Sequence, residues 1–178
     1  IVATGPAGAV AGTASSISYD LSAVEPTNAG TYAVLADFAP GDTTNYNNVT
    51  GGNAGSFVIQ PAATTTTVTC APGPFTYTGS AFEPCSAVVT GPGGLNLTLT
   101  VVYADNANAG TASASASYDG TPNYLASSDI KTFIIDKATP VLSVTGATPT
   151  YDGAQHAATV QGSVLGTVSN ILYDGQPT

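Results

Sequence analysis

The chain has 178 residues, only 7% of which are charged, and two lysines against eleven carboxylates give a net charge of −9. Ordinary globular domains carry about 25% charged residues. A chain so poor in cations lacks the basic surface that nucleic acid or an anionic membrane requires, which excludes both as partners. The sequence also lacks an apolar run of about 18 residues, so we expect no membrane insertion within this segment.

The N-terminal part, 1–61, contains two stretches that are typical of β-strands. Residues 31–38 read TYAVLADF and residues 56–59 read SFVI, and both are rich in residues that favour strands. No window of the chain combines apolar residues at helical spacing with good helix formers, and Gly, Pro, Thr and Ser interrupt every long stretch. The sequence therefore predicts strands and no helix.

Further strands are predicted in the middle of the chain. Residues 66–69 form a β-branched run, and residues 95–103 alternate as LNLTLTVVY with a period of two. Residues 111–118 alternate small residues as TASASASY, and residues 131–136 read KTFIID. Turn sequences rich in Gly and Pro, such as APGP and TGPGG, separate these stretches.

The last part begins with another strand signal, VLSV at residues 141–144, followed by a TYDG turn at residues 150–153. Short strands separated by such turns at intervals of about ten residues are typical of all-β domains. The predicted fold is therefore all-β, with small Ig-like β-sandwich modules placed in tandem.

The chain repeats itself at a nearly constant interval. The corresponding stretches are NAGTYAV at 28–34 and NAGTASA at 108–114, Asn45-Tyr46 and Asn123-Tyr124, SFVI at 56–59 and TFII at 132–135, and FTYTG at 75–79 and PTYDG at 149–153. Self-similarity at a fixed period, here about 76 residues, indicates an array of similar modules.

The repeat divides the chain into one complete module and two partial ones. Residues 62–137 form the complete module. Residues 1–61 lack the opening stretch that the complete module has at 62–86, and residues 138–178 lack the C-terminal half. We therefore expect the chain to be a segment of a longer protein, with its modules in an extended array joined by short linkers that contain proline.

Two groups of motifs resemble a known family. KATP followed by TYDG within residues 137–153, and PTNAGTY at 26–32 with Asn45-Tyr46 downstream, resemble the MBG-type tandem repeats of large bacterial surface proteins. Those repeats are similar to other Ig-like repeats of adhesins. The resemblance implies an extracellular structural or adhesive role and no catalytic residues. The central module departs from the pattern, because it has ANAG at 107–110 and adds two cysteines.

Those two cysteines, Cys70 and Cys85, are the only ones in the chain. The turn sequence at 71–74 lies between them, so their spacing suits a bridge between adjacent strands of one hairpin-like unit. In an exported protein we expect them to form a disulfide. A metal or redox pair is the weaker alternative, because there is no CxxC motif and no neighbouring histidine.

Few other residues suggest chemistry. Two sequons make Asn48 and Asn96 candidate glycosylation sites. His156 is the sole histidine, so a zinc site or a catalytic triad would lack ligands, and we expect it at the surface. The carboxylates are scattered singly without a calcium-loop motif, so we expect no metal and no cofactor, although Asp136 near a linker leaves a junction calcium site open.

These observations favour an extracellular structural protein over an enzyme: repeat modules of a cell-surface fibre, stalk or adhesin shaft. Self-association is the expected partnership. Residues 138–153 are an opening stretch of the kind that residues 1–61 lack, so we hypothesise strand donation between copies, head to tail, into a filament. Residues 158–178 would then duplicate material already present at 3–27, which argues against a simple swap.

The alternative is an adhesion module that binds a glycan or a protein on another surface. Such a module would present an exposed aromatic cluster on its loops. The candidates in the central module are Phe82, Tyr103, Tyr118 and Tyr124, each of which also suits a core position.

Overall fold

The computed structural model describes residues 3–145, 148–173 and 176–177. Strands dominate these residues, no α-helix occurs among them, and their helical structure is confined to the short 3-10 turn η1 (Pro92–Gly94). The predicted all-β class is therefore confirmed, in the form of several small sheets. Within the predicted last module, 138–178, residues 146, 147, 174, 175 and 178 lie outside the described residues.

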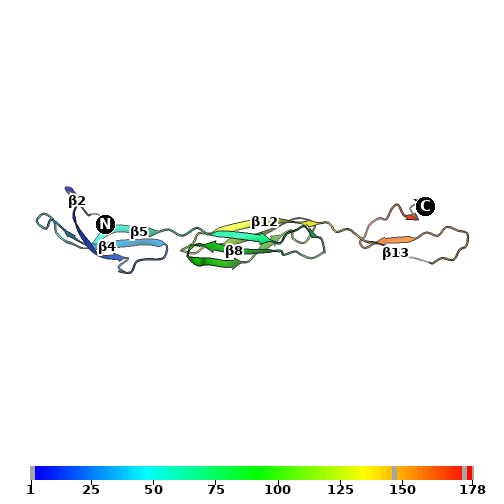
Figure 1. Cartoon of the computed structure of the whole chain (residues 1–178), viewed down its shortest axis with the longest axis horizontal. Coiled ribbons are helices and arrows are strands. Elements are labelled where there is room, and N and C mark those ends of the chain that lie inside the picture. The colour runs from blue at the N-terminus through cyan, green and yellow to red at the C-terminus, as the bar shows by residue number, and fades with distance from the viewer. Residues whose placement is uncertain (1–2, 146–147, 174–175, 178) are drawn as a thin grey trace. The chain divides into compact units, whose positions relative to one another are not determined.

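The first segment, residues 3–59, forms two antiparallel sheets. A hairpin comes first, and a three-stranded sheet follows with its strands in chain order (Figure 1). The strands are β1 (Ala3–Gly5) and β2 (Gly8–Val10) in the hairpin, and β3 (Gly12–Tyr19), β4 (Gly30–Pro40) and β5 (Val49–Ile59) in the sheet. The predicted strand at 31–38 lies inside β4, and the one at 56–59 is the end of β5.

The central segment, residues 62–137, contributes strands to two further sheets. One is antiparallel with the order β6-β8-β9, and its strands are β6 (Thr65–Cys70), β8 (Cys85–Gly91) and β9 (Leu95–Leu99). The other has the order β10-β11-β12-β7, and its strands are β10 (Val102–Ala104), β11 (Gly110–Tyr118), β12 (Ser127–Asp136) and β7 (Phe75–Thr76). The short strand β7 runs parallel to the end of β12.

The strand predicted at residues 95–103 is wrong in its extent. The stretch divides into β9 and β10, which belong to different sheets, with Thr100 and Val101 between them. The period-two pattern persists on both sides of this break, so alternation of apolar residues could not reveal that the chain changes sheets. The same change occurs between β6 and β7, and there the APGP turn at 71–74 marks it.

Burial follows the alternation that the sequence shows. Thr66 and Val68 are the buried residues of β6, and Ala87 and Val89 are those of β8. In β11 the buried residues are the alanines of TASASASY, at 112, 114 and 116. The buried side chains of these strands are thus small or β-branched, and the residues that alternate with them along each strand face outward.

The last segment, residues 138–178, holds two short strand pairs. The strands are β13 (Leu142–Thr145) paired with β14 (Thr159–Gly162), and β15 (Leu172–Tyr173) paired with β16 (Gln176–Pro177). Large apolar side chains stay exposed here, and Leu142, Val144 and Leu172 are each more than half exposed.

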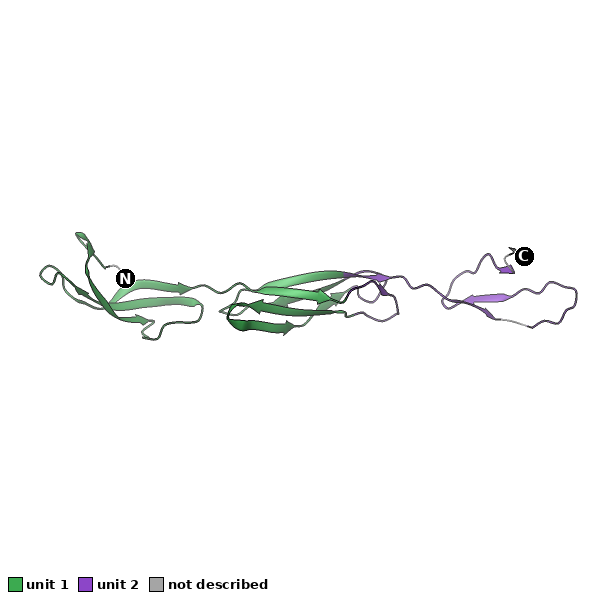
Figure 2. Cartoon of the chain, viewed as in Figure 1, with its two compact units in different colours: residues 1–71, 83–104, 113–132 green, residues 72–82, 105–112, 133–178 purple. Residues whose placement is uncertain are grey.

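By compactness the chain divides into two units (Figure 2). One comprises residues 1–71, 83–104 and 113–132, and the other comprises residues 72–82, 105–112 and 133–178. Both units take residues from the central segment. The division into modules at 1–61, 62–137 and 138–178 stays a prediction from the repeat.

Candidate functional site

The two cysteines lie directly opposite each other at the ends of neighbouring strands. Cys70 closes β6, Cys85 opens β8, and the antiparallel register pairs them. A disulfide of 2.07 Å joins their Sγ atoms. The ladder continues by one backbone hydrogen bond beyond them, from Ala71 N to Pro84 O at 2.9 Å. The disulfide that the sequence predicts is therefore a staple across two adjacent strands.

A tyrosine hydroxyl braces this staple from β10. Tyr103 Oη accepts a hydrogen bond from Cys85 N at 2.8 Å and donates one to Cys85 O at 2.9 Å. The hydroxyl thus satisfies both backbone groups of the residue at which β8 begins. Because a buried backbone group without a partner is costly, this double contact stabilises the start of β8 as well as the staple.

A row of side chains joins β6 to β12, and we call it the β6–β12 seam. Thr64 Oγ1 donates to Leu125 O at 2.8 Å, and the hydroxyls of Thr66 and Ser127 lie 2.8 Å apart. Further along, Val68 N donates to Asp129 Oδ2 at 2.9 Å. Polar groups of β12 and of the loop before it therefore hydrogen-bond along this edge of β6, and at Val68 a side chain takes the place of a backbone partner.

The carboxylate of the seam is held in its charged form. The hydrogen bond from Val68 N–H lowers the pKa of Asp129 below its ordinary value, and the Ile130 N–H and the charge of Lys131 act in the same direction against partial burial. Lys131 Nζ lies 3.7 Å from Asp129 Oδ2. Both side chains of this ion pair reach solvent, so the backbone hydrogen bond is the stronger restraint.

Aromatic side chains pack together at the C-terminal end of β12. Phe133 packs edge-on against Phe75, with ring centroids 5.7 Å apart, and Phe75 also packs against Phe82 at 5.3 Å. Beside them β7 pairs with β12, and Tyr77 N donates to Asp136 O at 2.9 Å. Phe133 is 7% exposed, and its repeat counterpart Phe57 is 45% exposed.

The linker between β5 and β6 is held by a turn of the central segment. Ala62 N donates to Asn123 O at 2.9 Å, and Leu125 N donates to Ala62 O at 2.8 Å. These bonds form a short parallel bridge between Ala62 and Tyr124. The Tyr124 hydroxyl in turn donates to Pro92 O at 2.7 Å. The linker is therefore a hydrogen-bonded part of the fold.

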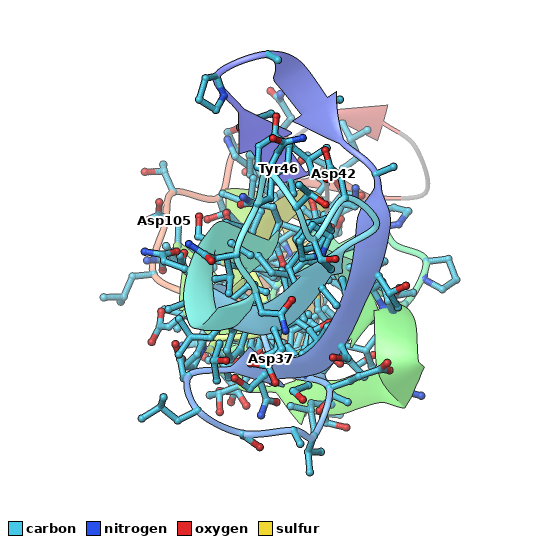
Figure 3. All side chains as sticks on the ribbon, turned by 90° about the vertical axis from the view of Figure 1, so that its left-hand side faces the viewer. Asp37, Asp42, Tyr46 and Asp105 are labelled. Atoms are coloured by element: carbon cyan, nitrogen blue, oxygen red, sulfur yellow. A yellow bond between two sulfur atoms is a disulfide. The ribbon has the colours of Figure 1, made fainter. Side chains whose placement is uncertain are left out.

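The corresponding turn of the first segment lies at residues 42–46 (Figure 3). The side chain of Asn45 donates to Asp42 Oδ2 at 2.7 Å, and this bond, followed by backbone N–H groups of Asn45 and Thr44, lowers the pKa of Asp42. Tyr46 lies against Gly5, where an added Cβ would come 2.6 Å from its ring. Tyr46 thus closes this end of the first segment, as Tyr124 does in the central one.

The remaining candidate residues lie apart from one another. Asn48 is exposed in the loop before β5, and Asn96 is exposed on β9, so both sequons are accessible. His156 is exposed and lies 3.0 Å from Asp152 in the same loop. Within the described part of the chain, no three His, Cys, Asp or Glu residues gather closely enough to hold a metal ion.

The aromatic residues considered for glycan binding are largely engaged within the fold. The hydroxyls of Tyr103 and Tyr124 bond to backbone groups, and Phe82 packs on Phe75. Tyr118 is half-buried at the end of β11. No helix in the described ranges has the length and apolar character to cross a membrane.

The comparisons with known proteins agree with the motif resemblance. Residues 2–63 match the family model described as MBG domain. The match covers the first segment and ends within the linker, and it confirms the MBG resemblance that the motifs indicate. No curated protein and no solved structure shows a significant similarity to the chain.

Proposed function

We propose that this chain is a run of repeat modules from an extracellular protein, and that the modules form the shaft of a cell-surface fibre, stalk or adhesin. Each module is a small Ig-like β-sandwich, and its role is structural. The observation that carries the proposal is the internal repeat, of which one copy matches the MBG domain.

The linker supports a stacked arrangement over a loosely tethered one. β5 ends at Ile59 and β6 begins at Thr65, so the stretch 60–64 alone joins the two strands. Within this linker Ala62 is bonded on both sides to the turn at Asn123 and its neighbour Leu125. A linker that is short, contains proline and is hydrogen-bonded has little freedom to bend. Such junctions suit a shaft that holds a terminal domain away from the cell.

The covalent chemistry supports a location outside the cell. Disulfides persist in oxidising compartments and are rare in the cytosol. The Cys70–Cys85 bond and the MBG match therefore both point to a surface or extracellular protein. Because only 7% of the residues are charged, the polarity of the surface comes mainly from uncharged residues such as Thr, Ser and Asn.

Antibody labelling tests the location. An antibody raised against residues 62–137 is expected to label intact cells that make the protein, and brief protease treatment of those cells should remove the label. A cytosolic protein probed in parallel should be labelled only after permeabilisation. If the repeat modules also require permeabilisation, the proposal is wrong.

Head-to-tail strand donation is a further part of the proposal. Phe57 is 45% exposed, whereas Phe133 at the same place in the repeat is 7% exposed and packs against Phe75 of the opening stretch. The last segment offers an opening stretch of the same type, with Val141 70% and Leu142 64% exposed. A donated strand would bury these apolar groups together.

Electron microscopy of the full chain and two variants tests the donation. The full chain is expected to form filaments, and a chain without residues 138–178 is expected to stay monomeric. A full-length Leu142→Asp variant keeps the length of the chain and should also lose the filaments. Polymers that persist after the deletion, or a full chain that stays monomeric at high concentration, would remove strand donation from the proposal and leave the shaft role standing.

The alternative of a glycan- or surface-binding module has less support. The hydroxyls of Tyr103 and Tyr124 are committed to backbone contacts inside the fold. A glycan array probed with the full chain separates the two functions, since a shaft module is expected to bind no glycan on it.

A further inference from the structure

One side chain of the central segment makes a two-point contact with the first segment. Asn123 Oδ1 accepts a hydrogen bond from Ala29 N at 2.6 Å, and Asn123 Nδ2 donates to Asn28 Oδ1 at 2.9 Å. These partners lie 94 and 95 residues earlier in the chain. A primary carboxamide suits this site because it presents one acceptor and one donor side by side.

Both sides of this contact are fixed by their own segments. On the first segment, Tyr32 Oη donates to Asn28 O at 2.8 Å, and Gly30 directly begins β4. On the central segment, Thr121 and Tyr124 exchange two backbone hydrogen bonds across the turn that presents Asn123. Groups held in place before they meet lose little freedom on contact, which favours a defined geometry.

The residues that meet here are the two motifs that recur along the chain. Asn28-Ala29-Gly30 recurs as Asn108-Ala109-Gly110, and Asn45-Tyr46 recurs as Asn123-Tyr124. The period of the repeat thus brings an Asn-Ala-Gly turn of one module to the Asn-Tyr turn of the next. A chance contact between two surfaces is not expected to involve two motifs that both recur along the chain.

We propose that these turns form a junction clasp, in which the asparagine of an Asn-Tyr turn is bound by the Asn-Ala-Gly turn of the preceding module. The clasp fixes the orientation of successive modules. It rests on the proposed function, because it requires modules that follow one another in a shaft. Asn108-Ala109-Gly110 is then a docking surface, and its partner is a following repeat module that presents an Asn-Tyr turn.

The linker strengthens this assignment. Asn123 uses its backbone oxygen to accept from Ala62 N, while its side chain binds the Asn-Ala-Gly turn. The same residue therefore restrains both the linker and the end of the first segment. Loss of its side chain should leave the linker bridge in place. The first segment would then be free to change its orientation relative to the central segment.

Residual dipolar couplings test the clasp in the weakly aligned full-length Leu142→Asp chain, which is expected to stay monomeric and serves as the wild type for the junction variants below. In the wild type, residues 3–59 and the central segment are expected to share one alignment tensor. Asn123→Ala removes both bonds and should give two different tensors, whereas Asn28→Ala removes only the bond from Asn123 Nδ2 and should uncouple the tensors partially. Amide chemical shifts away from the junction should stay unchanged in both variants, which shows that both segments are still folded. Asn96→Ala, at an exposed position on β9, is the matched control and should keep a single tensor.

Two further variants sharpen the result. Asn123→Asp keeps the acceptor for Ala29 N but loses the donor to Asn28, so it should uncouple the tensors partially. Asn28→Ala combined with Asn123→Ala should add nothing to Asn123→Ala alone, because Asn123→Ala already removes both bonds. A single tensor retained in Asn123→Ala, or two tensors in the wild type, would overturn the clasp.

The docking surface at Asn108 is tested in a chain extended by one module. A second copy of residues 62–137 placed directly after residue 137 should share the alignment of the first copy, and Asn108→Ala should separate them. An unchanged tensor in that variant would overturn the docking role of Asn108. These measurements concern purified chains, so their failure would leave the cell-surface labelling result intact and is distinguishable from failure of the proposed function.

Discussion

Asp129 accepts a hydrogen bond from the backbone of Val68 on a strand of the other sheet, with 2.9 Å between Oδ2 and N. The pKa of Asp129 is lowered chiefly by this N–H. A carboxyl whose pKa is lower in the folded state stabilises the fold above its ordinary pKa of about 4, and this stabilisation is lost as the pH falls through the lower, folded value.

We therefore expect the β6–β12 seam to weaken in acid. Asp129→Asn should lower the free energy of unfolding of the central segment at neutral pH, and the difference from the wild type should shrink as the pH falls below about 4. Urea titrations followed by circular dichroism between neutral pH and strong acid measure this difference. Asp119→Asn, in an exposed turn, is the control. A difference that does not vary with pH would contradict the assignment.

Loss of the disulfide should destabilise the central segment. The bond joins cysteines with a sequence separation of 15, and closing a loop of that length stabilises a fold by about 3 kcal/mol in the chain-entropy description. Cys70→Ser combined with Cys85→Ser should lose about this much in urea titrations, and a reducing agent should have the same effect on the wild type. A reductant that also shifts the unfolding of the double variant would show that its effect does not come from this bond.

The two repeat-related phenylalanines should differ in their contributions to stability. Phe133→Ala removes a buried ring that packs on Phe75 and should cost about 3–5 kcal/mol. Phe57→Ala removes a half-exposed ring that packs on Tyr19 and should cost about 1 kcal/mol. Denaturation followed by NMR resonances of each segment separates the two effects. These values hold for the monomeric chain that lacks residues 138–178, where equal losses would contradict the prediction. In the full chain, strand donation would cover Phe57 and raise the cost of Phe57→Ala.

The turn before Asn123 depends on a glycine. Gly120 has a φ of +84°, and an added Cβ would lie 2.6 Å from Tyr124 O. Gly120→Ala should therefore combine backbone strain with a backbone clash and destabilise the turn by more than about 1 kcal/mol. Gly79→Ala is the matched control, because Gly79 has a φ of +85° and an added Cβ there would meet its nearest atom at 3.9 Å. Similar melting temperatures for the two variants would contradict this interpretation.

Local patterns predict the strands whose sequences alternate or are rich in β-branched residues. The TASASASY stretch lies within β11 and the KTFIID stretch ends β12. The strands β1 to β3 give no such signal, because Gly, Ala and Ser dominate residues 3–19 and carry little strand preference of their own. Those strands form through pairing with their neighbours, which a local pattern does not show.

The candidate sites also differ in whether the sequence predicts them. The disulfide between Cys70 and Cys85 is predictable, because two cysteines allow one pairing and an exported protein favours its formation. The contact of Asn123 with Ala29 joins residues 94 apart, and nothing near either residue indicates the other. The recurrence of both motifs is the one available signal, and it shows a period without showing which turns meet. The bond of Asp129 to Val68 likewise depends on how two sheets are placed.

The staple also sets how far the chain can be drawn out. Tension applied at the two ends passes from Cys70 to Cys85 through the sulfur atoms, so the stretch 71–84 between them carries none of it. Fully extended, that stretch would add about 50 Å of contour length per staple. Pulling on single molecules should recover that length only after reduction. In oxidising surroundings the chain is therefore shorter and stiffer under load than its residue count implies.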